Sequence, residues 1–295
     1  MTDRDFHPQD FHPLDPLTRD EFTAVVDILG TAHGVAAPEW RYASIEMAEP
    51  DKAALARYDA DATVPERAAH VVCFERASNK TYKALVSLTD STVTTWEHIP
   101  GVQANFTVDE WEEADAALRS HPDVIAALAR RGITDMSLVF MDTWTYGAVL
   151  IPERYRGRRI GWSDSWVRKG PGMNPYAGPV NGFHCIIDLN SMELLEIEDT
   201  FTLDNPEIMG EYVPAHLPEE IRAASTREPL RALDITQPDG PSFTLTGHRL
   251  DWQNWSLRVG FNHREGMTLH AVSYNDNGRR RPIAHRMSFA EMMVP

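Results

Sequence analysis

The first three quarters of the chain contain the same order of local sequence signals twice. Thr18 with Glu21, and Thr107 with Glu110, have the spacing of capping boxes, which start helices by exchanging side-chain to backbone hydrogen bonds. A helical pattern follows each capping box, and four strand-like runs follow each helical pattern. The repeat predicts an α+β fold made of two copies of one module, each a small antiparallel sheet backed by a helix.

The strand-like runs are rich in β-branched and aromatic residues. They cover residues 41–47, 70–75, 82–88 and 93–97 in the first copy, and 136–144, 159–166, 183–189 and 194–198 in the second copy. A tight turn separates the last two runs of each copy, with Asp90 and Ser91 in the first copy and Asn190 and Ser191 in the second. We therefore expect one module over residues 17–98 and another over residues 99–225.

An arm precedes the modules over residues 1–16, where the tetrapeptide Asp-Phe-His-Pro occurs twice, at 5–8 and 10–13. Proline at this density prevents helix and strand formation, so an extended arm is expected, either mobile or packed on a surface. His7 and His12 are candidate metal ligands. The arm is the preferred interpretation, because no further ligand lies at a local spacing.

The final segment, residues 226–295, has only strand signals. Trp255, Leu257, Val259 and Phe261 alternate onto one face, and residues 275–278 (Asn-Asp-Asn-Gly) predict a hairpin. The pattern predicts an antiparallel meander of about four strands with one apolar face. No further element of the chain is available to cover this face, so we expect something outside the chain to cover it.

Charge and cysteine content exclude several classes of partner. The net charge of −16 argues against nucleic acid and against anionic membrane surfaces, although residues 226–295 carry nine basic and seven acidic side chains. No apolar run is long enough to cross a bilayer. Cys73 and Cys185 are single cysteines inside apolar runs, which is typical of buried thiols in the reducing cytoplasm.

The motifs of several enzyme classes are absent from the sequence. There is no glycine-rich dinucleotide or phosphate loop, no Gly-x-Ser-x-Gly, no His-x-His and no His-Glu-x-x-His. Glu196, Glu198 and Asp199 are interpreted as a solvated run of charge. His98, His248, His263, His270 and His285 are interpreted as structural or solvated. The chain therefore shows no self-contained active site.

The last 70 residues resemble the opening of the large C-terminal sandwich domain of copper/topaquinone amine oxidases. The resemblance is carried by residues 252–255 (Trp-Gln-Asn-Trp), 258–261 (Arg-Val-Gly-Phe), 264–266 (Arg-Glu-Gly) and 288–295. Residues 12–17, 125–132 and 174–177 resemble the two small α+β domains that precede this sandwich in bacterial members. The resemblance covers essentially the whole chain, and it implies that residues 226–295 form the first strands of the sandwich.

In this family the catalytic aspartate, the Asn-Tyr-x-Tyr segment that yields topaquinone and three copper-binding histidines follow the position of Pro295. None of the eight tyrosines of this chain lies in an Asn-Tyr-x-Tyr segment. The resemblance implies that copper and topaquinone are held by a partner chain. It also implies that this chain supplies no catalytic, cofactor-binding or metal-binding residue and cannot oxidise an amine alone.

The resemblance further implies that the second module forms part of a substrate channel. Phe106, just before the second capping box, is the main candidate for an aromatic of the channel wall, followed by Trp144 and Trp166. The alternative is that all three are core aromatics. Aromatic channel residues favour an arylalkyl amine as substrate.

Three hypotheses stay open at this point. In the first, which we favour, the chain is a subunit of a divided amine oxidase, and a second polypeptide completes the sandwich in an assembly of two plus two chains. In the second, it is a non-catalytic binding or regulatory protein whose sheet is capped by self-association. In the third, it is a fragment of one longer oxidase.

Overall fold

The computed structural model describes residues 12–147, 150–205, 210–225, 227–228 and 230–289. The chain forms two compact units. The first contains residues up to 73, residues 82–98 and residues from 233 onward, and the second contains residues 74–81 and 99–232. The two expected modules, with their boundaries at 17–98 and 99–225, remain predictions.

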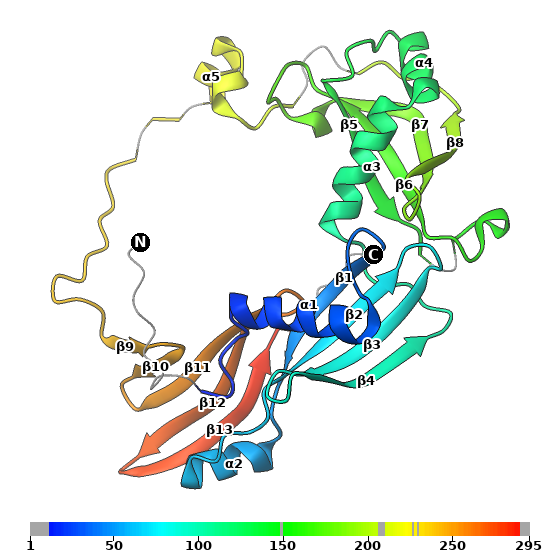
Figure 1. Ribbon diagram of the computed structural model, residues 1–295. Coiled ribbons are helices and arrows are strands. Elements are labelled where there is room, and N and C mark those ends of the chain that lie inside the picture. The colour runs from blue at the N-terminus through cyan, green and yellow to red at the C-terminus, as the bar shows by residue number, and fades with distance from the viewer. Residues whose placement is uncertain (1–11, 148–149, 206–209, 226, 229, 290–295) are drawn as a thin grey trace. The chain divides into compact units, whose positions relative to one another are not determined.

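The first sheet consists of four strands in sequence order: β1 (Trp40–Ala48), β2 (Ala68–Glu75), β3 (Lys80–Ser87) and β4 (Thr92–Ile99) (Figure 1). Helix α1 (Arg19–His33) begins with the predicted capping box, in which Thr18 Oγ1 accepts from the Glu21 backbone N–H. The helix ends at Gly34, whose positive φ of 67° suits glycine. Val25 and Leu29 of α1 are fully buried and pack on the sheet.

The first unit also contains a helix that the sequence patterns did not predict, α2 (Lys52–Asp61), between β1 and β2. Asp51 caps its first turn by accepting from the Ala54 backbone N–H at 2.7 Å. Leu55 is its one buried residue, so the helix has almost no apolar stripe for a periodicity argument to detect.

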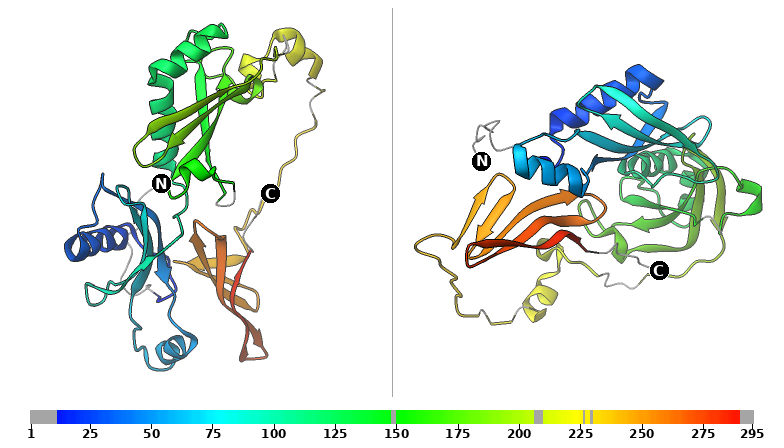
Figure 2. Two further views of the ribbon diagram at one scale, coloured as in Figure 1. Left: turned by 90° about the vertical axis from the view of Figure 1, so that its right-hand side faces the viewer. Right: turned by 90° about the horizontal axis from the view of Figure 1, so that it is seen from below.

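In the second unit, α3 (Val108–Ser120) and α4 (Pro122–Arg130) lie on one face of a four-stranded antiparallel sheet (Figure 2). The strands, in sheet order, are β5 (Val139–Thr145), β6 (Ile160–Val167), β7 (Pro179–Asp188) and β8 (Glu193–Asp199). The remaining elements are the short helices η2 (Glu153–Tyr155), η3 (Pro175–Ala177), η4 (Pro214–His216) and α5 (Glu219–Ser225). Leu118 and Leu128 of the helices pack against Met141 and Phe183 of the strands, which places the core on the helical face.

The same arginine–glutamate clamp occurs in both halves. Arg67 donates from Nε to Glu21 Oε1 at 2.6 Å, and Arg159 donates from Nε to Glu110 Oε1 at 2.6 Å. Each glutamate belongs to a capping box, and each arginine directly precedes a strand, β2 for Arg67 and β6 for Arg159. The terminal guanidinium nitrogens also donate to carbonyl oxygens just before the helix, at Pro13, Asp15 and Pro16 for Arg67 and at Ala104 and Asn105 for Arg159. The clamp therefore joins three chain segments at equivalent places of the two halves.

The last segment forms a five-stranded antiparallel sheet, not the expected four strands. Its strands are β9 (Phe243–Thr246), β10 (Arg249–Trp252), β11 (Trp255–Asn262), β12 (Gly266–Asp276) and β13 (Arg279–Ser288), which follow one another in the sheet. The unpredicted strand is β10, which has four residues and lies between two tight turns. Turn residues on both sides dominate the local sequence pattern, so a strand of four residues is not recognised from it.

The two faces of this sheet differ in their contacts. Arg258, His270 and Arg286 align across β11, β12 and β13 and form ion pairs with acidic residues of the first unit. On the opposite face, Phe261 is 70% exposed, Met267 is 50% exposed and Met287 is 49% exposed. Ion pairs with residues distant in sequence thus hold the polar face against the N-terminal part of the same unit. The apolar face is exposed in the described part of the chain.

Candidate functional site

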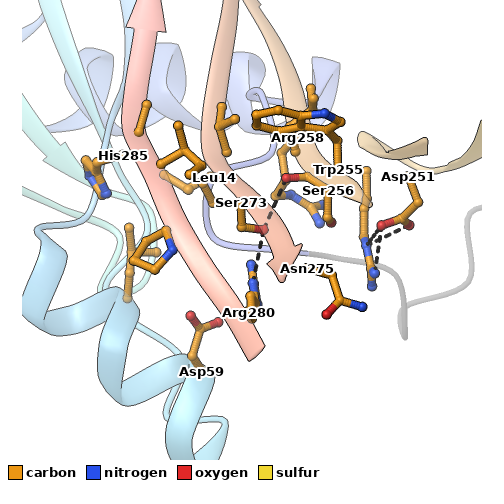
Figure 3. A pocket seen from close by; sticks show the side chains of 18 of the residues that line it. Leu14, Asp59, Asp251, Trp255, Ser256, Arg258, Ser273, Asn275, Arg280 and His285 are labelled. Atoms are coloured by element: carbon orange, nitrogen blue, oxygen red, sulfur yellow. Dashed lines mark hydrogen bonds and ion pairs between the residues drawn. The ribbon is translucent and has the colours of Figure 1, made fainter. Parts of the chain in front are cut away.

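A cavity of about 970 Å³ lies in the first unit between α2 and the strands of the last sheet (Figure 3). Its walls carry both charged and apolar side chains, including Leu14, Asp59, Asp251 and Arg280. Arg280 Nε donates to Ser273 Oγ at 3.1 Å, and Asp251 pairs with Arg249. The lining therefore carries more cationic than anionic side chains, and the Arg249–Asp251 pair neutralises part of this charge.

The end of the N-terminal arm is built into this region. Leu14 and Asp15 are each 3% exposed, and Arg258 Nε donates to Asp15 Oδ1 at 3.1 Å. His12 accepts from the Leu14 backbone N–H at 3.1 Å through Nδ1. Burial, aided by the nearby Arg258 guanidinium, lowers the pKa of His12 to about 4. His7, the other candidate ligand of the arm, lies outside the described residues.

A second polar cluster centres on Glu49, which follows β1. Glu49 Oε1 lies 3.0 Å from His270 Nε2 and accepts from Arg286 Nε at 2.9 Å. The hydrogen bond with His270 lowers the pKa of Glu49, and the bond from Arg286 adds to the effect. Arg286 also pairs with Glu265 of the same sheet. This cluster fastens the last sheet to the first one, as expected for a structural histidine at position 270.

In the second unit, the face of the sheet opposite the helices carries an unusual set of side chains. Asp142, Asp164, His184 and Glu198 are register partners across β5, β6, β7 and β8, and we call them the carboxylate row. Since side chains alternate along a strand, the four residues project from one face. The row places three carboxyl groups and one imidazole side by side.

Hydrogen bonds and burial define the surroundings of Asp142, Asp164 and His184 in the carboxylate row. Asp142 is 5% exposed, and its Oδ1 accepts from Trp111 Nε1 at 3.1 Å. His184 Nδ1 lies 3.0 Å from Asp164 Oδ1. Burial raises the pKa of Asp164; His184 opposes this shift and the neighbouring Asp142 carboxylate adds to it. Two carboxyl groups therefore lie close together in a partly desolvated setting.

Aromatic rings border the carboxylate row on both sides. Trp162 of β6 stacks on the His184 ring, with 4.5 Å between the ring centroids. Trp144 lies opposite Trp162 on the neighbouring strand β5. On the other side, Trp166 contacts Tyr176 edge to face, with 5.0 Å between centroids. This combination of carboxylates and indole rings suits a cation that carries an apolar group.

The structure brings two of the three predicted channel residues to one face. Trp144 and Trp166 lie on β5 and β6, on the same face as the carboxylate row, and Trp144 is 60% exposed. Phe106 lies on the other side of the sheet, where it is half-buried and packs on the core of the second unit. The assignment of all three to a substrate channel stays a prediction.

Asp142, Asp164 and His184 were not among the candidate residues predicted from the sequence, and Glu198 was interpreted only as part of a run of charge. Of that run, Asp199 pairs with Arg131 and Glu196 with Arg154 and Tyr155. Period-two alternation could have placed the four residues of the row on one face of their strands. The register that aligns them is set by long-range pairing, which a local pattern does not reveal.

Within the described ranges, no three His, Cys, Asp or Glu side chains come together in an arrangement that could hold a metal ion. The described side chains therefore do not fit copper, and no step of copper chemistry is assigned to them. Across the same residues, no helix is both long enough and apolar enough to cross a membrane.

Comparison with known families assigns the chain to a class. Three family models match consecutive segments: the copper amine oxidase N2 domain at residues 12–99, the N3 domain at 109–211 and the copper amine oxidase enzyme domain at 244–295. The chain belongs to the copper amine oxidase family and corresponds to the N-terminal part of its members. The expected fold, two small α+β domains followed by the first strands of the sandwich domain, is confirmed.

Individual relatives give the same result. A primary amine oxidase of Arthrobacter sp. (strain P1) is 39% identical over 286 residues, and the peroxisomal N-methylputrescine oxidase 1 of Nicotiana tabacum is 31% identical over 326 residues. The solved structure of a copper-containing benzylamine oxidase from Hansenula polymorpha has the same fold, with 23% identity and a TM-score of 0.77 over 94% of this chain and 44% of that one.

The matches cover only part of each relative. The Arthrobacter alignment includes 96% of this chain but 42% of the relative, and the tobacco alignment includes 97% and 41%. The chain thus spans about two fifths of the length of the curated relatives that it matches.

Proposed function

We propose that this chain is the scaffold subunit of a divided copper amine oxidase. A second polypeptide would hold topaquinone and copper, and the assembly would convert primary amines to aldehyde, ammonia and hydrogen peroxide. The observation that carries the proposal is the open apolar face around Phe261, Met267 and Met287, on a sheet that matches the start of the family's enzyme domain. A complementary sheet bearing the redox groups would cover that face.

The substrate class is proposed as arylalkyl primary amines. The support is the set of aromatic side chains on the second sheet, including Trp144 and Trp166, in a module that matches the N3 domain. We also propose a reducing compartment, the cytoplasm. Cys73 and Cys185 are free and buried, and burial raises the pKa of each thiol to about 12, so neither is poised for oxidation.

The test is co-expression with the product of a neighbouring reading frame that carries Asn-Tyr-x-Tyr and His-x-His. We expect the two polypeptides to co-purify as two plus two chains and to release peroxide from phenylethylamine. Phe261→Asp should prevent co-purification, because it places a charge in the proposed interface. Val108→Asp, an exposed apolar position of α3 in the other compact unit, is the matched control and should leave assembly intact.

Three outcomes contradict the proposal. If the reading frame continues past residue 295 into the catalytic half, the sheet that covers the apolar face belongs to the same longer chain and not to a partner. A stable metal-free homo-oligomer that excludes the second polypeptide would favour the alternative, a binding or regulatory protein capped by self-association. Peroxide release from amines by this polypeptide alone would show that the redox groups are not in a partner.

A further inference from the structure

We propose that the cavity between α2 and the last sheet is the docking site for the N-terminal arm of the same chain, residues 1–11. The arm docks through its two Asp-Phe pairs, at positions 5–6 and 10–11, and connects α2 with strands β10 to β13. The inference concerns the first unit alone, and it does not depend on the proposed function.

The first argument is the place where the described chain begins. His12 forms part of the cavity wall, and residues 1–11 are joined directly to it. Asp15 fixes this point of the chain, because it is 3% exposed and forms an ion pair with Arg258 of the sheet. An extended chain advances at most about 3.6 Å per residue, so the backbone of the pair at 10–11 starts within about 7 Å of His12. The arm therefore reaches the cavity at a low cost of chain closure.

The second argument is complementary charge. The cavity is lined by four cationic side chains and two carboxylates: Lys52, Arg249, Arg258 and Arg280, with Asp59 and Asp251. Arg249 and Arg258 have carboxylate partners. Arg280 instead donates to the neutral hydroxyl of Ser273 at 3.1 Å (Figure 3), and in the described part of the chain neither Arg280 nor Lys52 forms an ion pair. The arm contains three aspartates and one arginine, so it supplies negative charge to this lining.

The third argument is apolar surface in the same cavity. Four apolar side chains also line it: Leu55, Trp255, Pro282 and Ile283. Ile283 is 54% exposed, so much of its surface is available for burial. An Asp-Phe pair presents a carboxylate and an aromatic ring at adjacent positions and can contact both kinds of lining. A small inorganic anion matches the charges alone, so the mixed lining favours an acidic, aromatic segment of chain.

The fourth argument is the repeated tetrapeptide Asp-Phe-His-Pro. The histidine of the copy at 10–13 is held in place, because His12 Nδ1 accepts from the Leu14 backbone N–H at 3.1 Å. The His12 ring also lies edge to face with the Tyr58 ring of α2, with 5.2 Å between the ring centroids. The copy at 5–8 has the same four residues. It therefore offers the same kinds of side chain to the rest of the lining.

The experiment is zero-length cross-linking of the full chain with a water-soluble carbodiimide, which joins a carboxylate to an amine in direct contact. Digestion and mass spectrometry then identify the joined residues. We expect Asp5 or Asp10 to be joined to Lys52, and not to Lys83, an exposed lysine of the first sheet. The yield should fall with added salt, because the contact is between charges.

Matched variants separate docking from chance encounters of a tethered arm. Arg280→Glu should lower the yield of the cross-link severalfold, because it turns an attraction into a repulsion. Arg279→Glu makes the same change of charge at the neighbouring position of β13, which is not among the lining residues, and should leave the yield unchanged. Both arginines are exposed, so both variants are expected to fold, and circular dichroism verifies this.

A second measurement uses a variant that leaves the described part of the chain unchanged. The double variant Phe6→Ser, Phe11→Ser keeps the charge of the arm and removes both of its rings. Hydrogen exchange of α2 should become severalfold faster than in the unchanged chain, because the arm no longer covers this helix. Exchange of α3, which belongs to the other unit, should stay the same.

The proposal is overturned if no carboxylate of the arm is joined to Lys52, if Arg280→Glu and Arg279→Glu behave alike, or if the double variant leaves the exchange of α2 unchanged. Cross-links that join two chains would assign the arm to a second copy of the protein. Protection of α2 by inorganic phosphate, without a cross-link to the arm, would assign the cavity to small anions. Either of these last two results also contradicts the proposal.

Discussion

At the scale of single residues, the two halves of the chain rely on the same interaction in different surroundings. The Arg159–Glu110 pair is fully buried, with side-chain exposures of 1% and 0%, and the guanidinium also lies 4.5 Å from the centre of the Phe74 ring. The Arg67–Glu21 pair has exposures of 12% and 21%. Because removal of one partner strands the other charge, the penalty depends on how deeply that charge is buried.

We therefore predict that Glu110→Ala lowers the free energy of unfolding by about 3–5 kcal/mol, because it leaves the Arg159 guanidinium buried without a counter-charge. Glu21→Ala should cost clearly less, since water reaches Arg67. Glu112→Ala, at an exposed position of the same helix as Glu110, should stay within about 0.5 kcal/mol. Urea unfolding followed by tryptophan fluorescence measures all three. Equal losses for Glu110→Ala and Glu21→Ala would contradict the argument.

His12 gives a prediction of pH dependence. Its pKa in the folded chain is about 4, whereas an unfolded histidine has a pKa of about 6.5. The unfolded state therefore binds the proton more readily, so the contribution of His12 to stability is complete above about pH 6.5 and is lost as the pH falls through 4. In His12→Gln this part of the decline should disappear. Unfolding midpoints at a series of pH values provide the measurement, and His98→Gln, at an exposed position, should keep the original profile.

At the scale of elements, the last sheet combines a fastened face and an open one. Polar side chains of β11, β12 and β13 bind acidic residues of the first unit, while Phe261 and Met267 on the other face are at least half exposed. Adjacent exposed apolar side chains on a sheet promote association. The open face should therefore govern the solution behaviour of the isolated chain.

We predict that the double variant Phe261→Thr, Met267→Thr binds severalfold less anilinonaphthalene sulfonate and self-associates less than the unchanged chain. Threonine keeps strand propensity while it removes apolar surface. Dye fluorescence and light scattering at several protein concentrations check this. Val108→Thr removes one isolated exposed apolar side chain from α3 and is not expected to alter either signal. Unchanged association of the double variant would show that another surface is responsible.

Local patterns predicted those elements whose signals are themselves local. The capping boxes located the starts of α1 and α3, and runs of β-branched and aromatic residues located β1 to β8 within a few positions. Helix α2 lacks an apolar stripe and β10 is too short to stand out, so both were missed. Helix α4 was also missed, because only one residue separates it from α3 and one helix was expected behind each sheet. The fastened face depends on Asp15 with Arg258 and Glu49 with His270, pairs separated by 243 and 221 positions. The carboxylate row likewise required a register that only the folded sheet supplies.

At the scale of the whole molecule, segments that are far apart in sequence belong to one compact unit. Residues from 233 onward belong to the same compact unit as residues up to 73, although the whole of the second module lies between them in sequence. The connection runs through exposed residues, among them Leu230, Leu233 and Ile235, which are 73%, 85% and 90% exposed. Exposed connections with few contacts are favoured sites of proteolysis.

We predict that trypsin cleaves first at Arg227 or Arg231 and that the nicked chain stays together. Denaturing electrophoresis should show two fragments, while size exclusion under native conditions should show one species, because Asp15 and Glu49 hold Arg258, His270 and Arg286. Adding Glu49→Gln should loosen the nicked complex. Release of the C-terminal fragment from the unchanged chain under native conditions would contradict the grouping.

The arginine–glutamate clamp also bears on how such a chain could arise. In each half, one guanidinium ties the start of a helix, the backbone before it and the beginning of a strand into a single junction. A segment with this junction contains within its own sequence the residues that hold its helix against its sheet. Copying its coding sequence in tandem would yield a second segment able to fold from the outset, after which its loops and outer surface could diverge toward a new task.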